Sequence, residues 1–337
     1  MRRWLVLLGV MLLLVGVPAG FAVRGGTFAM DEQTIRLPGN DGALDGVLVL
    51  PGQLSGPVPL VVFVHGDGPV DATDDGRYRP QFEALARAGV ASVSWSKPGV
   101  GGSAGDWLRQ DQADRVRETA GVIGFLRGRA DIDPDRIGLW GAGQGGWVVP
   151  AVAAADHRIA FVIAVSPAIN WMRQSLFHLT ATLDHDHADQ ATRDAELASW
   201  QRVAGVLDGS RSYDDYLLAA PSGERMSRAR WDFVLRNFKS DATGSLHRLA
   251  DAKTPVLLIL AGNDRTVDAH ETEKAYRTAL GGKRLTVRWF AGANHSLARS
   301  EVEDSTVRAH LTAIFTPRDL MAPGYLEALA GFAAATR

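Results

Sequence analysis

Short apolar runs alternate with amphipathic stretches along most of the chain. The apolar runs are typical of strands that are covered on both faces, and they occupy residues 59–64, 91–96, 161–165, 255–260 and 285–290. Apolar residues at helical spacing follow these runs and predict helices over residues 80–88, 114–127, 269–280, 302–315 and 325–335. Two β-like runs, 33–37 and 44–50, flank a Gly-Asn-Asp-Gly turn and predict a hairpin.

This alternation of strands and helices predicts the fold class and the domain organisation. Right-handed crossovers between such strands produce an α/β fold with a mainly parallel, doubly wound sheet. Residues 169–250 depart from the pattern, because they contain helical stretches and polar breaks but no good strand. We interpret them as a helical lid inserted between two core segments, residues 31–168 and 251–337.

The N-terminus predicts export. Arg2 and Arg3 precede an uncharged apolar run at 4–17, and Pro18 and small residues follow it. This order is typical of a secretory signal peptide, here residues 1–22. An uncleaved membrane anchor is the alternative, because about 20 apolar residues can span a bilayer. The sequence therefore predicts a protein that is secreted or anchored on the extracytoplasmic side of a membrane.

Composition narrows the kind of ligand. The formal net charge of −2 gives no general attraction for nucleic acid or for an anionic membrane. We expect a small-molecule substrate as the partner. The absence of cysteine excludes thiolate catalysis and disulfides. The acidic and histidine residues at 184–187 are interpreted as a solvated loop, since no third ligand pattern accompanies them. We expect neither a metal nor a cofactor.

A glycine-rich turn at residues 137–147 carries the most specific chemical signal. It follows a buried strand and leads into a helix that opens at Gln144. In the G-x-S-x-G nucleophile elbow, such a turn lifts a serine above a parallel sheet. Gly141 and Gly145 match the flanking glycines, but Gly143 stands at the serine's position. The sequence thus has the frame of a serine hydrolase without the attacking oxygen.

Together with this turn, four other motifs resemble the α/β-hydrolase fold. The similarity is to its secreted bacterial esterase branch, which is related to dienelactone-hydrolase and prolyl-oligopeptidase catalytic domains. The five motifs lie in the family's order over roughly residues 31–316, at His65-Gly-Asp-Gly-Pro69, at 97–103, at 133–146, at Gly262-Asn-Asp264 and at Gly292-Ala-Asn-His295.

The resemblance implies a role for several residues. Asp264 corresponds to the acid and His295 to the base of the catalytic triad. The backbone N–H groups of Asp67 and Gln144 correspond to the oxyanion hole. Lys97, at the end of a predicted strand, is a candidate substrate contact or a partner of Asp67.

Three interpretations remain open. In the first, an enzyme uses His295 and Asp264 as a general base on an ester- or carbonyl-bearing molecule, by water-mediated hydrolysis or by proton abstraction with elimination or cyclisation. In the second, an inactive pseudo-hydrolase binds a ligand or partner. In the third, the chain is an inactivated variant of a serine esterase. The presence of acid, base and both oxyanion donors favours the first.

Overall fold

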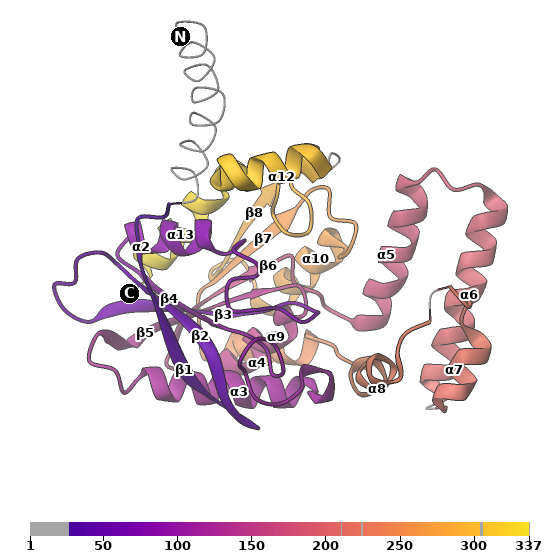
Figure 1. The fold of residues 1–337 in the computed structure, drawn as a ribbon, viewed down its shortest axis with the longest axis horizontal. Coiled ribbons are helices and arrows are strands. Elements are labelled where there is room, and N and C mark those ends of the chain that lie inside the picture. The colour runs from indigo at the N-terminus through magenta and orange to yellow at the C-terminus, as the bar shows by residue number, and fades with distance from the viewer. Residues whose placement is uncertain (1–26, 210, 224, 304–305, 337) are drawn as a thin grey trace, which may run out of the picture.

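The computed structural model describes residues 27–336 except 210, 224, 304 and 305. The predicted signal peptide or anchor at 1–22 lies outside the described residues. The centre of the fold is an eight-stranded sheet with the order β1-β2-β4-β3-β5-β6-β7-β8 (Figure 1). Only β1 with β2 and β2 with β4 pair antiparallel, and all other neighbours are parallel. This arrangement confirms the predicted mainly parallel α/β-hydrolase sheet.

The strands match the apolar runs closely. They are β1 (Asp31–Gly39), β2 (Gly42–Leu50), β3 (Val58–Val64), β4 (Ala91–Trp95), β5 (Ile132–Ala142), β6 (Ile159–Val165), β7 (Val256–Ala261) and β8 (Leu285–Phe290). In β3, Leu60 and Val62 face one core and Val61 and Phe63 face the other. Both faces of the central strands are therefore buried, which explains why these runs lack polar positions.

Helices cover the two faces of the sheet. One face packs against α2 (Arg79–Arg87) and α13 (Tyr325–Ala335). The other face packs against α3 (Gln112–Leu126), α4 (Gly145–Ala155), α9 (Thr243–Ala252) and α10 (Ala269–Leu280). Shorter elements complete the fold: η1 (Trp107–Arg109), α11 (Ser300–Glu303), α12 (Thr306–Phe315) and η2 (Pro317–Leu320).

Four helices between β6 and β7 project to one side of the core (Figure 1). They are α5 (Trp171–His185), α6 (Gln190–Asp208), α7 (Tyr213–Ala219) and α8 (Arg228–Asn237), and we call them the lid. Their apolar side chains form a separate cluster, in which the ring of Tyr216 stacks on Trp231 with centroids 4.4 Å apart. By contrast α9, the last helix of the segment predicted as a lid, packs into the main core through Leu246 and Leu249.

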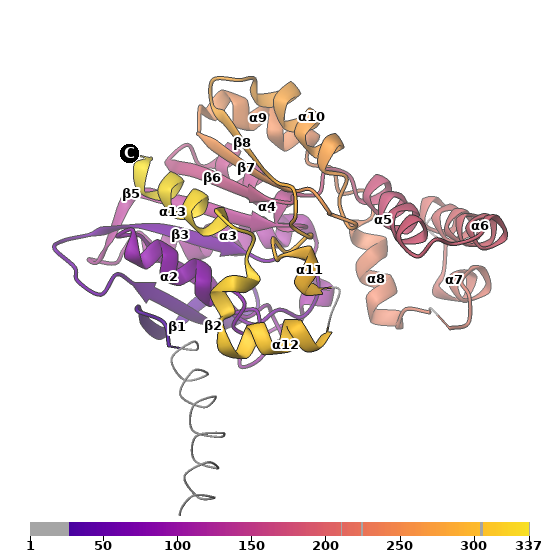
Figure 2. The same cartoon turned by 90° about the horizontal axis from the view of Figure 1, so that it is seen from above.

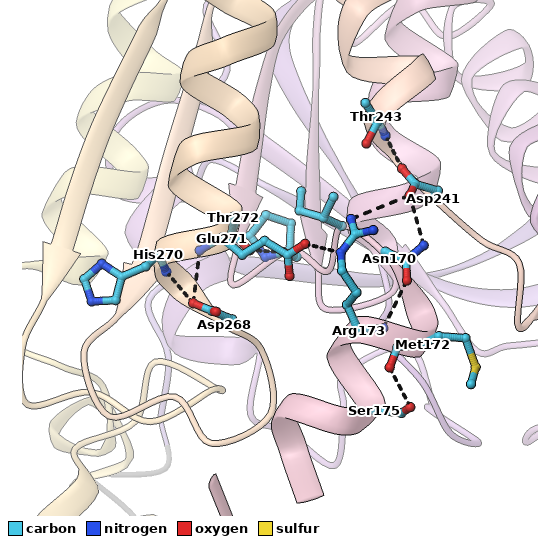
Figure 3. A network of polar contacts seen from close by, with 12 residues as sticks. Asn170, Met172, Arg173, Ser175, Asp241, Thr243, Asp268, His270, Glu271 and Thr272 are labelled. Atoms are coloured by element: carbon cyan, nitrogen blue, oxygen red, sulfur yellow. Dashed lines mark hydrogen bonds and ion pairs between the residues drawn. The ribbon is translucent and has the colours of Figure 1, made fainter. Parts of the chain in front are cut away.

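A polar network fixes the base of α5 to the core (Figure 3). Arg173 forms ion pairs with Glu271 of α10 and with Asp241, and Asn170 donates to Asp241 at 3.0 Å. These contacts join the first turn of the lid to two segments that follow it in sequence. Within the described residues, no helix is long and apolar enough to cross a membrane.

Candidate active site

The turn between β5 and α4 has the geometry of a nucleophile elbow. Gly143 has a φ of +50°, in the left-handed region, and its N–H donates to the carbonyl of Val165. Gly145 is required by close packing, because a Cβ there would lie 2.5 Å from the carbonyl oxygen of Val64. The turn therefore lies at the carboxyl ends of the strands, where ligands bind in such sheets.

Asp264 and His295 meet above this turn. They follow β7 and β8, and His295 Nδ1 lies 2.9 Å from Asp264 Oδ2. The other carboxylate oxygen accepts the N–H groups of Thr266 and Val267, and only 2% of the Asp264 side chain is exposed. Because a carboxylate accepts hydrogen bonds, Nδ1 carries the proton and Nε2 is left as the acceptor. A Cβ on Gly143 would lie 3.2 Å from that Nε2.

Asp67 and Gln144, the two predicted oxyanion donors, both line the same pocket as Gly143 and His295. Gln144 precedes the first turn of α4, whose positive end favours negative charge. Asp67 lies in the loop that follows β3. Neither N–H donates to another described residue, so both remain free to face a ligand. Their role as an oxyanion hole stays a prediction.

A cavity of about 1090 Å³ connects these groups with the lid. Gly143, Gln144 and His295 line it from the core, and α5 contributes Trp171 and His178. The Trp171 ring also stacks on Trp147 of α4, with centroids 5.4 Å apart. The cavity thus combines an aromatic wall with a few polar groups, as is typical of small-molecule sites.

Residues 56–302 match the model of a hydrolase family that is described as serine aminopeptidase, S33. The chain belongs to this family. The matched segment includes β3 to β8, the elbow and both residues of the His295–Asp264 pair.

Two individual relatives of this S33-family protein share about a quarter to a third of the residues that align with it. An uncharacterized 31.7 kDa protein of Escherichia coli is 31% identical over 107 residues, which cover 32% of the chain and 36% of that relative. The polyketide transferase claH of Penicillium crustosum is 24% identical over 229 residues, or 63% of the chain and 73% of claH. The chain therefore matches about a third of the first relative's length and about three quarters of the second's.

The solved structures show the same fold. The crystal structure of the hypothetical protein PA2218 from Pseudomonas aeruginosa has a TM-score of 0.57 and 16% identity, and it covers 92% of the chain and 95% of PA2218. At this level of identity the likeness concerns the fold alone.

Within this S33 fold, Arg230 is a site residue that the sequence pattern did not reveal. It comes from α8 of the lid, lines the cavity, and donates to both carboxylate oxygens of Asp67, at 2.9 Å to Oδ1. Burial alone would raise the pKa of Asp67, but the hydrogen bonds and charge of Arg230, with Lys97 nearby, lower it overall. Because 163 positions separate the two residues, only the packing of the lid could show the contact.

Lys97 lies beneath the same loop and not among the residues that line the cavity. Its Nζ donates to the carbonyl of Gly66 at 2.6 Å and lies 5.2 Å from the centre of the Trp107 ring. Burial lowers the pKa of Lys97 well below its usual value, and the charge of Arg115 adds to this effect. The predicted substrate contact of Lys97 stays a prediction, and in this structure the side chain supports the loop that carries Asp67.

Proposed function

We propose that this S33-family protein is an enzyme that acts on an ester- or carbonyl-bearing small molecule without a serine nucleophile. The observation that carries the proposal is the aim of His295. Its Nε2 points at the place where Gly143 lacks a side chain, and buried Asp264 holds the opposite side of the ring. The name of the relative claH, a polyketide transferase, supports a carbonyl-rich substrate.

In the hydrolytic form of the reaction, a water occupies the position that a serine hydroxyl would take. Nε2 of His295 accepts one proton from this water while its oxygen adds to the carbonyl carbon. The carbonyl becomes an oxyanion that the N–H groups of Asp67 and Gln144 stabilise. When the tetrahedral intermediate collapses, the bond to the leaving oxygen breaks and that oxygen takes the proton from His295. Asp264 stabilises the ring while it is charged.

The same base supports a second outcome on a suitable substrate. If the acidic hydrogen lies on the carbon next to the carbonyl, Nε2 takes that proton and the oxyanion donors stabilise the enolate. In an elimination, the bond to a leaving group on the next carbon breaks and that group takes the proton from His295. In a cyclisation, the enolate carbon bonds to a second carbonyl carbon and the oxygen of that carbonyl takes the proton. We further propose that the reaction takes place outside the cytoplasm, on the basis of the apolar segment at 4–17.

The experiment compares the wild-type chain with His295→Ala and Asp264→Asn on a panel of aryl esters, thioesters and lactones. The expected result is slow turnover with no initial burst, because no acyl-enzyme forms. Both variants should lose that turnover, because the reaction needs the His295 base and the Asp264 carboxylate that orients it. Intact-mass measurement during turnover should show no acylated protein.

Two results would count against the proposal. If His295→Ala turns over the substrates as fast as the wild type, His295 is not the base. If none of the three proteins turns over any substrate, but the wild type binds panel compounds in the cavity, the chain acts as a binding protein instead.

A further inference from the structure

Helix α12 exposes apolar side chains. Leu311 and Ile314 are each 51% exposed and lie three positions apart, so they share one side of the helix. Among the described residues, no other helix or strand carries two exposed large apolar side chains. We call the surface formed by Leu311 and Ile314 the α12 face.

The α12 face lies where the described chain begins. Arg318, in the η2 turn directly after α12, donates to the carbonyl of Thr27 at 2.8 Å. Its guanidinium also lies 4.6 Å from the centre of the Phe28 ring. Both views show α12 at the same edge of the molecule as the start of the described chain (Figures 1 and 2). The chain that precedes Thr27, and with it the apolar run at 4–17, is therefore joined to the described part of the chain near this helix.

A side cavity with both apolar and charged walls lies between this edge and the active site. A side cavity of about 460 Å³ is lined in part by Phe28, Met30, Pro317 and Leu320. It shares Leu320, as well as Asp75 and Arg77, with the main cavity.

The charges beside the side cavity are largely paired. Arg79 pairs with Glu32, and Arg318 pairs with Glu83. Strong attraction to an acidic partner is therefore not expected, and burial of apolar surface remains as the driving force.

From this placement we propose that the α12 face rests on a lipid bilayer, into which the apolar N-terminal segment inserts. A helix that presents large apolar side chains on one side is suited to lie in the interfacial layer of a membrane. The chain that enters the domain beside α12 would hold the α12 face at the bilayer surface. The lid projects from another side of the core (Figure 1) and would remain in water. This inference does not depend on the proposed chemistry.

The absence of cysteine allows a direct test on the full chain. Ile314→Cys or Leu311→Cys is labelled with an environment-sensitive fluorophore and mixed with phosphatidylcholine vesicles. The matched control is Leu218→Cys on lid helix α7, where the leucine is 87% exposed. All three positions are on the surface, so the label should leave folding intact, which circular dichroism would verify.

The expected result is a shift of emission to shorter wavelength and quenching by a doxyl lipid at positions 311 and 314 but not at 218. Flotation of the vesicles in a density gradient shows whether the chain binds them. If the chain floats with the vesicles but the emission at 311 and 314 is unchanged, the N-terminus anchors the protein while the α12 face stays in water, and the proposal is wrong. Chains that do not float would overturn the proposal too. Equal shifts at all three positions would also overturn it, because they would indicate nonspecific adsorption.

Discussion

Arg230 of the lid holds both carboxylate oxygens of Asp67, the residue whose backbone N–H is a predicted oxyanion donor. The guanidinium also lies 4.9 Å from the centre of the Phe233 ring and 5.6 Å from that of Trp107. Two rings and one carboxylate therefore fix its orientation. This pair therefore links the position of the lid to that of the loop that carries Asp67.

The pair should be measurable as a coupling free energy. Arg230→Ala, Asp67→Ala and the double variant form a cycle, and urea unfolding gives each stability. The two side chains are 28% and 38% exposed, so the expected coupling is only about 1 kcal/mol. Arg228→Ala on the same helix is the control, since its pair with Asp232 is more exposed and should contribute less. A coupling of zero would show that the lid does not hold the loop.

Lys97→Met distinguishes support of the loop from contact with substrate. The variant keeps an apolar side chain but loses the hydrogen bond to Gly66. If Lys97 supports the loop, the variant's free energy of unfolding in urea should be lower by about 1–3 kcal/mol, because the carbonyl of Gly66 loses its hydrogen bond to Lys97. A raised KM with unchanged stability would instead support the predicted substrate contact. Lys239→Met is the control, because Lys239 is exposed and its Nζ lies 5.3 Å from the centre of the Phe238 ring.

The sequence alone predicts those strands and helices that follow from the local pattern of apolar residues and from their order in the chain. The continuous apolar runs predicted β3 and β7 as buried strands. The roles of Asp264 and His295 came from the resemblance of their motifs to the α/β-hydrolase family, and the two side chains lie 2.9 Å apart in the structure. The pair Arg230–Asp67 was not accessible in this way. It depends on how the lid packs, and an arginine on a helix is usually solvated.

The burial of Lys97 escaped prediction for a similar reason. A lysine at the end of a strand reads as a surface or ligand-binding residue, and only the arrangement of the loop around Gly66 shows that it is enclosed. The boundary of the lid had the same difficulty. Helix α9 reads like the helices before it, and its contacts with α4 and α10 are long-range.

His65 should make the fold sensitive to acid. Its Nε2 is 2.5 Å from the carbonyl oxygen of Trp95, and its Nδ1 is 3.2 Å from the hydroxyl of Tyr78. Since a carbonyl only accepts, the ring is neutral with its proton on Nε2. Burial, aided by the charge of Lys97, lowers the pKa of His65 from 6.5 to about 3.

The sign of the effect follows from proton binding. Below pH 6.5 the unfolded chain binds a proton that the folded ring refuses, so stability is lost as the pH falls from 6.5 toward about 3. The expected contribution at pH 5 is about 2 kcal/mol. Urea unfolding from pH 7 to pH 4 should show a weaker pH dependence for His65→Gln than for wild type, even if the variant is less stable at pH 7. The control His157→Gln, at an exposed loop position, should keep the wild-type slope.

Gly143→Ser should convert the site to serine chemistry. A Cβ at this position lies 3.2 Å from Nε2 of His295, so the hydroxyl would come within hydrogen-bond reach of the base. The variant should form a covalent adduct with a fluorophosphonate, detected by intact mass, and cleave p-nitrophenyl esters with a burst. Because φ is +50°, the new side chain should also reduce the stability by about 1–2 kcal/mol.

Two companion variants separate the chemistry of Gly143→Ser from its strain. Gly143→Ala carries the same backbone cost without the hydroxyl, so it should lose similar stability and form no adduct. Adding His295→Ala to Gly143→Ser should abolish labelling, since the serine is then left without its base. If Gly143→Ser folds and binds the cavity's ligands but remains unlabelled, then Gly143 does not occupy the nucleophile's position. The aim of His295 would then need another explanation.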